Sequence, residues 1–428
     1  MAKVRLDSWK AIAQYLDRGP RTVQRWHAEH GLPVHHFGGT QGCVFAYAEE
    51  LDNWLSGVGA GPGLAIANGG GAEAARSESS GPTAQADEMW ATRSEWNISS
   101  IAGLYRGVLN ADPGNVRALT GLACTMVSSA IFEVVDSSVA FACATDSLRR
   151  VPIQGSQYSD AHCCGAFLKM LCERKWRQAR IAFEELLREQ PSHPFGLKGR
   201  ALLHVADSEL QDASSCAWKA WLQSPLASSA QILICWIEFL AGDYNSALDL
   251  VAQFTASGSS GSMIATIQAL ALSQNAPDAS RIGHIAALVD DFPENRTLRG
   301  ILGYAYANSG ETERACQVLK VLQEMCERKK KNCSYALALP LIGLNRKQEA
   351  ISWLETSYEQ GAIWSLGFRS DPILKPLRGE PRFEALLRNI GSQPELFAID
   401  QARYRPEAMR FGPKGVSVED MERSEAVS

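Results

Sequence analysis

The sequence has no apolar run long enough to cross a membrane. Its most apolar window, ILICWIEFLAG at residues 232–242, is shorter than the roughly 20 residues that a bilayer requires, and it contains Glu238. The first residues, MAKVRLDSWK, also lack the apolar stretch and the small-residue cleavage site of a secretory signal. We therefore expect a cytoplasmic protein with no membrane partner.

Positive charge is not in excess either. The 428 residues include 42 lysines and arginines against 47 aspartates and glutamates, which gives a formal net charge of -5. Such a chain has no general attraction for nucleic acid, so any contact with DNA has to come from a local patch. Hydrophobic residues make up 46% of the sequence, which is enough for the cores of two or three domains.

Closely spaced cysteines are scarce: the eleven cysteines lie singly along the chain, apart from the adjacent Cys163 and Cys164. An odd number of isolated cysteines is typical of reduced, buried thiols in a cytosolic protein. A metal site at His162, Cys163, Cys164 and Cys172 is the alternative. Neighbouring positions on a helix point about 100° apart, however, and do not chelate one ion well. We therefore predict no metal site.

The familiar catalytic motifs are also missing. The sequence has no phosphate-binding loop, no Gly-x-Ser-x-Gly turn, no His-Glu-x-x-His and no zinc-type spacing. Glu184 and Glu185 fit a solvated helix face better than an acid–base pair. The basic run ERKKKN at residues 327–332 is expected to be a solvated turn, with a partner-binding patch as the alternative. The sequence thus predicts a protein that is not an enzyme and that binds no cofactor.

Composition divides the chain into parts. Residues 57–88 are rich in glycine, alanine and serine and show no sustained period, which predicts a flexible linker. Residues 1–56 then form a small separate domain. Residues 89–395 are helical in pattern, and residues 396–428 are expected to be a polar tail.

A 34-residue period runs through the long helical part. Ala179, Ala213, Ala247 and Ala315 lie on one grid, which Arg281 interrupts. Three further sets accompany the grid: twelve residues after it come Pro191, Pro225 and Pro293; twelve before it come Phe167, Ala201, Cys235, Ala269 and Gly303; seven after it come Leu186, Ala220, Phe254, Leu288 and Leu322. Small residues suit closely crossing helices, apolar residues fill the seam between them, and proline ends a helix.

These phased positions resemble the tetratricopeptide repeat, a hairpin of two helices. LGYAYANSGETERA from Leu302 and AGDYNSALDL from Ala241 match its pattern best, whereas Pro113 does not fit the grid and predicts an irregular second repeat. RSDPILKPLRGEPRFEALLRNIG is similar to the last helix that ends many bacterial tetratricopeptide proteins. The resemblance implies a mainly α fold, an α-solenoid of about seven or eight helical hairpins. It also implies a protein or peptide partner in the inner groove, which the first helices of the hairpins line.

A helix-turn-helix pattern occupies the start of the chain. Trp9, Ile12, Ala13 and Leu16 share one face of a predicted helix, and Pro20 is well placed to begin a second helix after a turn. Val23 and Trp26 are spaced to face the first helix, which leaves the other side to polar residues. The candidate DNA-binding residues on and beside this helix are Arg18, Arg21, Thr22, Gln24 and Arg25.

These residue types suit DNA. Arginine recognises guanine, glutamine recognises adenine, and threonine contacts the backbone or a thymine methyl group, with Arg18 on a phosphate. A solvated helix face is the alternative. Next, GLPVHHF, a GGTQG turn and CVFAYAEELDNWL predict a hairpin and a short helix over about residues 48–55.

This order of elements resembles a MerR-like or excisionase-like winged helix-turn-helix domain, over about 50 residues, with RTVQRW and GLP as its most specific parts. The resemblance implies binding to double-stranded DNA. Six basic groups balance six acidic ones in residues 1–56, however, and the hairpin tip carries no charge. One copy should bind weakly, so we also expect a homodimer.

Histidines gather in the same domain. His35 and His36 at the base of the hairpin can add positive charge when they are protonated, so we include them among the DNA-binding candidates. A metal site with His27 and His30 is the alternative, but no cysteine–histidine pairing has zinc-finger spacing.

Together these features predict a DNA-binding transcription regulator of bacterial type, whose solenoid binds a protein or peptide. The alternative is a non-enzymatic interaction scaffold whose first domain docks protein and no longer binds DNA. The uncharged hairpin tip favours the scaffold, and the outward Arg-Gln-Arg face favours the regulator.

Overall fold

The fold is described from a computed structural model. It describes residues 5–6, 9–16, 23, 32–36, 44–47, 51, 81–95, 97–152, 159–225, 227–274, 277–329 and 333–392. The chain divides into two compact units, Met1–Ala75 and Arg76–Ser428, and each is treated by itself.

The first unit contains one described helix and a small sheet. Helix α1 (Trp9–Tyr15) accompanies β1 (Arg5–Leu6), β2 (His35–His36) and β3 (Val44–Tyr47), and the antiparallel strands lie in the order β1-β3-β2. The core of this unit contains Ile12, Ala13, Leu16, Val23, Leu32, Val34, Val44, Ala46 and Leu51. The predicted first helix and the pairing of the hairpin strands are therefore confirmed. A complete winged helix-turn-helix stays a prediction, because most of residues 17–31 and 48–56 lie outside the described residues.

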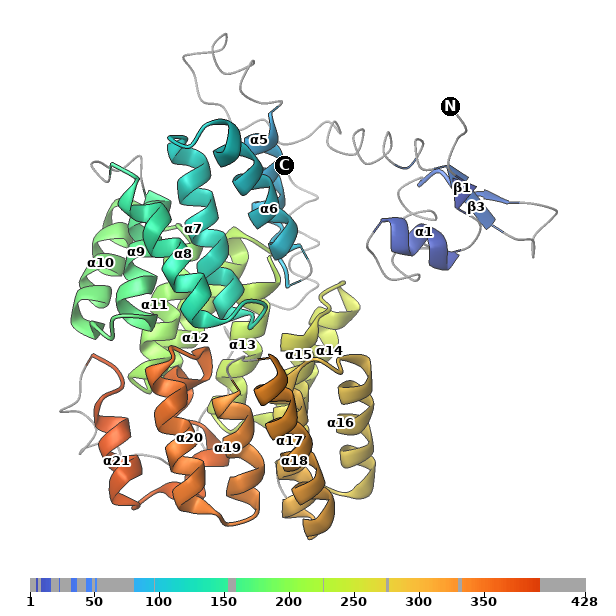
Figure 1. Ribbon diagram of the computed structural model, residues 1–428, viewed down its shortest axis with the longest axis vertical. Coiled ribbons are helices and arrows are strands. Elements are labelled where there is room, and N and C mark those ends of the chain that lie inside the picture. Colours follow the sequence, from blue (N-terminus) through green and yellow to red (C-terminus); the bar gives the residue numbers. More distant parts are fainter. Residues whose placement is uncertain are drawn as a thin grey trace, which may run out of the picture. The chain divides into compact units, whose positions relative to one another are not determined.

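The second unit is a succession of helices, which Figure 1 shows from α5 to α21. The α-helices are α5 (Pro82–Ala91), α6 (Ile98–Ala111), α7 (Val116–Ile131), α8 (Ser137–Arg149), α9 (Ser159–Leu171), α10 (Trp176–Glu189), α11 (Pro194–Ala206), α12 (Leu210–Gln223), α13 (Ser228–Leu240), α14 (Tyr244–Ala256), α15 (Ser262–Leu272), α16 (Ala279–Asp291), α17 (Arg296–Asn308), α18 (Thr312–Lys329), α19 (Ser334–Gly343), α20 (Lys347–Glu359) and α21 (Pro381–Arg388). Two 3-10 helices, η2 (Ile363–Gly367) and η3 (Pro372–Leu377), separate α20 from α21. Within the described residues, α5 to α20 pair as eight hairpins, in agreement with the predicted α-solenoid.

The sequence grid matches the packing of these hairpins. The four grid alanines lie on the second helices α10, α12, α14 and α18, and each is 0% exposed. Pro191, Pro225 and Pro293 follow directly on the ends of α10, α12 and α16. A side chain larger than alanine at the grid positions would push the two helices of a hairpin apart, which explains the period.

The turns show how the motif residues act locally. In the AGDYNSALDL segment, Gly242 has a φ of 81°, a left-handed conformation that glycine adopts without strain. Asp243 then caps α14, because its carboxylate accepts a hydrogen bond of 3.0 Å from the backbone N–H of Ser246.

The irregular second repeat has a clear cause. Helices α9, α11, α13, α15 and α17 begin 34 or 35 residues apart, whereas α7 begins at Val116, 43 residues before Ser159 at the start of α9. Helix α7 has 16 residues where α9 has 13, and nine residues separate α8 from α9 where four separate α10 from α11. A longer helix and a longer connection shift the phase of the sequence while the order of helices stays the same.

Three local predictions need correction. Helix α5 begins at Pro82, so the segment predicted as a linker over residues 57–88 ends earlier than expected. Helix α18 extends to Lys329, so residues 327–329 of the predicted turn at 327–332 are helical, and residues 330–332 lie outside the described residues. The cysteines are not all reduced and buried: Cys326 and Cys333 form a disulfide, and Cys172 and Cys316 are exposed.

None of the helices in the described part of the chain has the length and apolar character needed to span a bilayer.

Candidate functional site

The predicted DNA-binding residues cannot be placed by this structure. Arg18, Arg21, Thr22, Gln24 and Arg25 lie outside the described residues. The backbones of His35 and His36 form β2, paired with Phe45 and Val44 of β3, but their side chains are not described. These assignments stay predictions.

The inner face of the solenoid is covered by the chain itself. Helices α11, α13 and α15 are buried on nearly all sides, unlike the one-sided burial of the second helices. The segment after α20 packs against them: Trp364 of η2 lies edge-on to Trp236 of α13, with ring centroids 5.6 Å apart, and stacks on Tyr335 of α19 at 5.4 Å. Helices η2 and η3 therefore pack on part of the side where the sequence predicts a groove lined by the first helices, and a partner in that groove stays a prediction.

A cavity persists where this covering is incomplete. It contains about 520 Å³ of space that no atom fills, part of it continuous with solvent. Its wall draws on five successive first helices and η2, through Phe167 of α9, Leu202 of α11, Leu233 of α13, Ile267 of α15, Ile131 of α7 and Trp364 of η2. Apart from indole N–H groups, Lys198 and Ser229 are its polar residues among those described. An apolar pocket with a few polar groups is the usual form of a small-molecule site.

Lys198 of α11 is the chemically distinctive residue of this cavity. Its side chain is buried, and its ammonium donates a hydrogen bond of 2.7 Å to Ser229 Oγ and lies 5.0 Å from the ring centroid of Phe195. Burial lowers the pKa of Lys198 well below its usual value, and the nearby positive charge of Arg93 lowers it further. Lys198 is not among the site residues predicted from the sequence.

Arg93, in the turn between α5 and α6, is a second buried cation near the same ring. Its guanidinium carbon lies 4.3 Å from the centroid of Trp90 and 5.7 Å from that of Phe195. One guanidinium nitrogen donates to the Trp90 carbonyl at 2.9 Å, whereas the buried Nε has no described hydrogen-bond partner. Burial lowers the pKa of Arg93 to about 10, so it stays charged at neutral pH.

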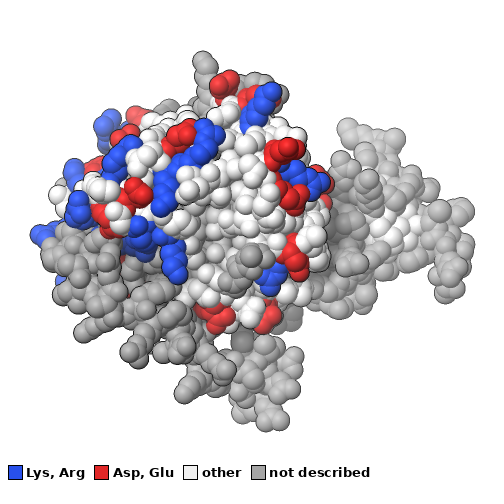
Figure 2. Space-filling view, turned by 90° about the horizontal axis from the view of Figure 1, so that it is seen from below, with Lys and Arg blue, Asp and Glu red and all other residues white. Residues whose placement is uncertain are grey.

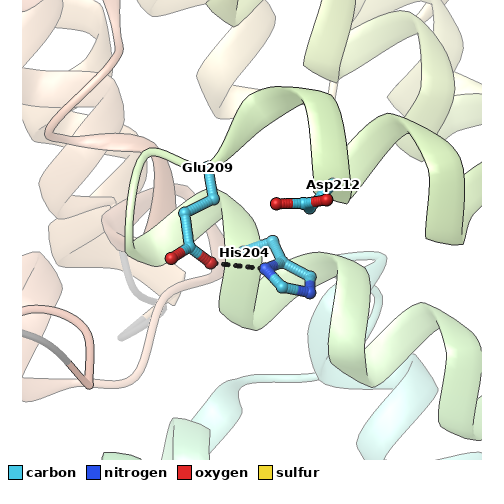
Figure 3. A group of neighbouring side chains, drawn as sticks. All are labelled: His204, Glu209 and Asp212. Carbon is cyan, nitrogen blue, oxygen red and sulfur yellow. Dashed lines mark hydrogen bonds and ion pairs between the residues drawn. The ribbon is translucent and has the colours of Figure 1, made fainter.

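A second polar cluster lies between α11 and α12, where Figure 3 shows His204, Glu209 and Asp212. Their spacing could accommodate a metal ion. His204 Nδ1 and Glu209 Oε2 are only 2.6 Å apart, however, and Arg180 approaches Glu209 at 3.6 Å. Burial lowers the pKa of His204, but hydrogen bonds to Cys216 and Glu209 outweigh burial and raise it to about 9. Because Glu209 already pairs with both His204 and Arg180, we interpret the cluster as an ion pair that fixes the turn between α11 and α12.

The outer surface carries charge of both signs. On the face in Figure 2, lysines and arginines gather toward one side, acidic residues lie among them, and the centre has few charged side chains. Exposed pairs of this unit include Arg346 with Glu349 and Arg382 with Glu355, each at 2.6 Å. This face therefore presents no uniform positive field for a DNA backbone.

Known proteins resemble this chain only distantly. No family model matches it. No curated protein sequence matches it either. Among solved structures it is similar to the APC/C hetero-tetramer Cut9–Hcn1, at 15% identity and a TM-score of 0.45, over 79% of this chain and 59% of that one. It is also similar to a tetratricopeptide repeat protein from Parabacteroides merdae, at 14% identity and a TM-score of 0.39, over 59% of this chain and 96% of that one. A third is yeast Tom70, at 13% identity and a TM-score of 0.36, over 77% and 70%.

Proposed function

We propose that this protein is a DNA-binding transcription regulator, in which the first unit binds double-stranded DNA and the tetratricopeptide-type unit binds a protein or peptide. The observation that carries the DNA-binding half is the burial of Val23, which is helical and 0% exposed in the core of the first unit. Positions two residues to either side of a helical residue lie about 160° around the axis from it. Burial of Val23 thus supports an outward position for Arg21 and Arg25, flanked by Thr22 and Gln24.

We infer that the second unit binds its partner on its outer side. The large apolar residues that this unit exposes in its described part, Val139, Ile181, Leu222, Val321 and Trp353, all lie on second helices. Exposed apolar side chains mark a protein interface where they form one patch, and an exposed tryptophan is among the residue types most enriched at such interfaces. These residues support a partner on the outer side, since η2 packs against the first helices α13 and α19.

The rival function is an interaction scaffold with no affinity for DNA. The balanced charge of residues 1–56 favours it, because phosphate contacts supply much of the affinity of DNA-binding proteins. If the protein is a regulator, we expect a homodimer to offset the weak DNA affinity of one first unit, because two copies then bind one DNA together.

The experiment is a fluorescence-polarisation assay of the full chain on genomic fragments at two salt concentrations. The regulator should bind more weakly at the higher salt concentration, and Arg25→Ala should weaken binding by about 1–3 kcal/mol. Glu49→Ala is the matched control in the same unit and should not weaken binding. Absence of salt-dependent binding would reject the regulator and leave the scaffold.

A further inference from the structure

The second unit buries two cations beside one aromatic ring. Lys198 and Arg93 come from different hairpins, and both lie near Phe195, at 5.0 Å and 5.7 Å from its centroid. Both side chains are at least nine-tenths buried. Removing a positive charge from water is costly unless an anion or several acceptors replace the lost hydration.

The described residues do not supply that replacement. The ammonium of Lys198 has three N–H donors, and Ser229 Oγ is the acceptor that they find among the described residues. Neither Lys198 nor Arg93 forms a salt bridge with a described carboxylate. The carboxylate of Asp160 attracts Arg93 electrostatically, but it lies 3.2 Å from the ring of His193 and is half-exposed.

The groups around Lys198 show which charge is missing. The titratable groups that act on it are Arg93 from the turn after α5, Cys124 from α7 and Cys163 from α9. A hydrogen bond with Cys164 and burial raise the pKa of Cys124, and burial raises the pKa of Cys163, so both thiols are neutral at neutral pH. The polar end of the cavity is therefore positive or neutral, and an anion entering it would meet no opposing charge from these groups.

We propose that this cavity binds a small apolar molecule with one carboxylate, which pairs with Lys198 while the hydrocarbon part lies against Phe167, Leu233, Ile267 and Trp364. The apolar wall excludes water, which strengthens an ion pair formed at its end. Bound carboxylate stabilises the charged form of Lys198, so binding at alkaline pH takes up a proton. The inference concerns the second unit alone and does not depend on DNA binding by the first.

The test is isothermal titration calorimetry of the full chain with hexanoate, octanoate and 4-phenylbutyrate, each beside its alcohol. At least one carboxylate should bind about tenfold or more tightly than its alcohol, because a hydrogen bond to a charged group in an apolar site is worth more than one between neutral groups. At pH 8.5, the binding enthalpy should vary with the ionisation enthalpy of the buffer, which measures the proton taken up.

The decisive variant is Lys198→Met, which keeps the length of the side chain and removes its charge. It should lose the preference for the carboxylate and the proton uptake, and it should keep its affinity for the alcohol. Lys320→Met, on the exposed side of α18, is the matched control and should behave as the unmodified protein. If Lys198→Met does not fold, Ser229→Ala tests the same site through the acceptor that orients the ammonium, and it should reduce carboxylate affinity.

Two results would overturn the proposal. One is equal affinity for every carboxylate and its alcohol in the unmodified protein. The other is a carboxylate preference that survives unchanged in Lys198→Met. Loss of DNA binding in the fluorescence-polarisation assay affects neither result, so the two proposals fail separately.

Discussion

Single buried charges set the pH response of the second unit. Glu238 of α13 is 0% exposed, and neither carboxylate oxygen has a hydrogen-bond partner among the described residues. Burial raises its pKa to about 7, with a further contribution from the negative charge of Asp243. Because the folded protein favours the protonated form, this residue stabilises the fold below its ordinary pKa of 4.5, and the contribution is lost as the pH rises through about 7.

Replacement of Glu238 by glutamine should therefore stabilise the protein at alkaline pH. We expect a gain of roughly 1–3 kcal/mol in the free energy of unfolding at pH 8.5 and little change at pH 5, measured by urea denaturation. Glu185→Gln, on the exposed face of α10, is the control and should leave both values unchanged. An equal effect of Glu238→Gln at the two pH values would show that the carboxylate does not titrate in this range.

The unusual position of Lys198 could be recognised from the sequence. This lysine lies three residues before Ala201, and the 34-residue grid places Cys164, Ile232, Thr266 and Gly300 at the equivalent positions. A lysine among small and apolar residues on an inner helix is visible in the sequence. Its proximity to Arg93 was not predictable, because Arg93 lies in the turn between α5 and α6, which the 34-residue period does not include.

Close helix crossings limit the side chains that the hairpins accept. A Cβ atom added to Gly199 of α11 would lie 2.2 Å from the ring of Phe183 on α10, which is fully buried. Such a contact cannot form without movement of a packed ring. The same relation holds between Gly121 of α7 and Tyr105 of α6.

Gly199→Ala should destabilise the protein by about 1–3 kcal/mol, despite the better helix propensity of alanine. Gly165→Ala on α9 is the matched control, since a Cβ atom there meets nothing within 4 Å. It should stabilise the protein by up to about 1 kcal/mol. Thermal or urea unfolding of the two variants measures both changes in the free energy of unfolding. A stabilising Gly199→Ala would contradict the close packing of α11 against Phe183 of α10.

Local periodicity was sufficient to predict most helices, but it did not predict helix α5 or the Cys326–Cys333 disulfide. Helix α5 has a single fully buried residue, Ala86, so its ten residues carry almost no periodic apolar signal. The Cys326–Cys333 disulfide joins two residues whose Cα atoms lie 6.1 Å apart. A separation of seven residues in the sequence does not specify such a distance.

At the scale of the whole second unit, contacts between distant repeats close the solenoid on itself. Glu95, before α6, accepts hydrogen bonds from Ser262 Oγ at 2.5 Å and from the Met263 backbone N–H at 3.1 Å. At the other end, Asp207 accepts hydrogen bonds of 2.6 Å from both the backbone N–H and Oγ of Ser392, and pairs with Arg180. In Figure 1, α21 accordingly lies below α10.

Asp207→Ala should release the closing segment. We expect faster amide hydrogen exchange in α21 (residues 381–388) and a loss of about 2 kcal/mol in the free energy of unfolding, because Arg180 and Ser392 lose a buried acceptor. Glu311→Ala, which removes an exposed pair with Arg314, should cost little. Unchanged exchange in α21 would mean that other contacts hold the segment, such as the hydrogen bond from Trp176 Nε1 to the Asn389 carbonyl and the burial of Phe383.

This closure could not be predicted from the repeat pattern. Each hairpin follows from residues within one period, but the contacts that join Glu95 to Met263 and Asp207 to Ser392 span 168 and 185 residues. Small rotations between neighbouring hairpins accumulate along a solenoid, and the sequence does not state their sum. The packing of η2 against α13 and α19 inside the predicted groove could not be foreseen for the same reason.

Repeat families commonly change in length by duplication or loss of whole units, since an open array tolerates one unit more or fewer. Here that freedom is lost. Deleting the α13–α14 hairpin would preserve the period yet separate Glu95 from Ser262 and remove the wall that contains Ser229. The contacts of Glu95 with Ser262 and of Asp207 with Ser392 thus fix how many repeats can lie between the residues that they join.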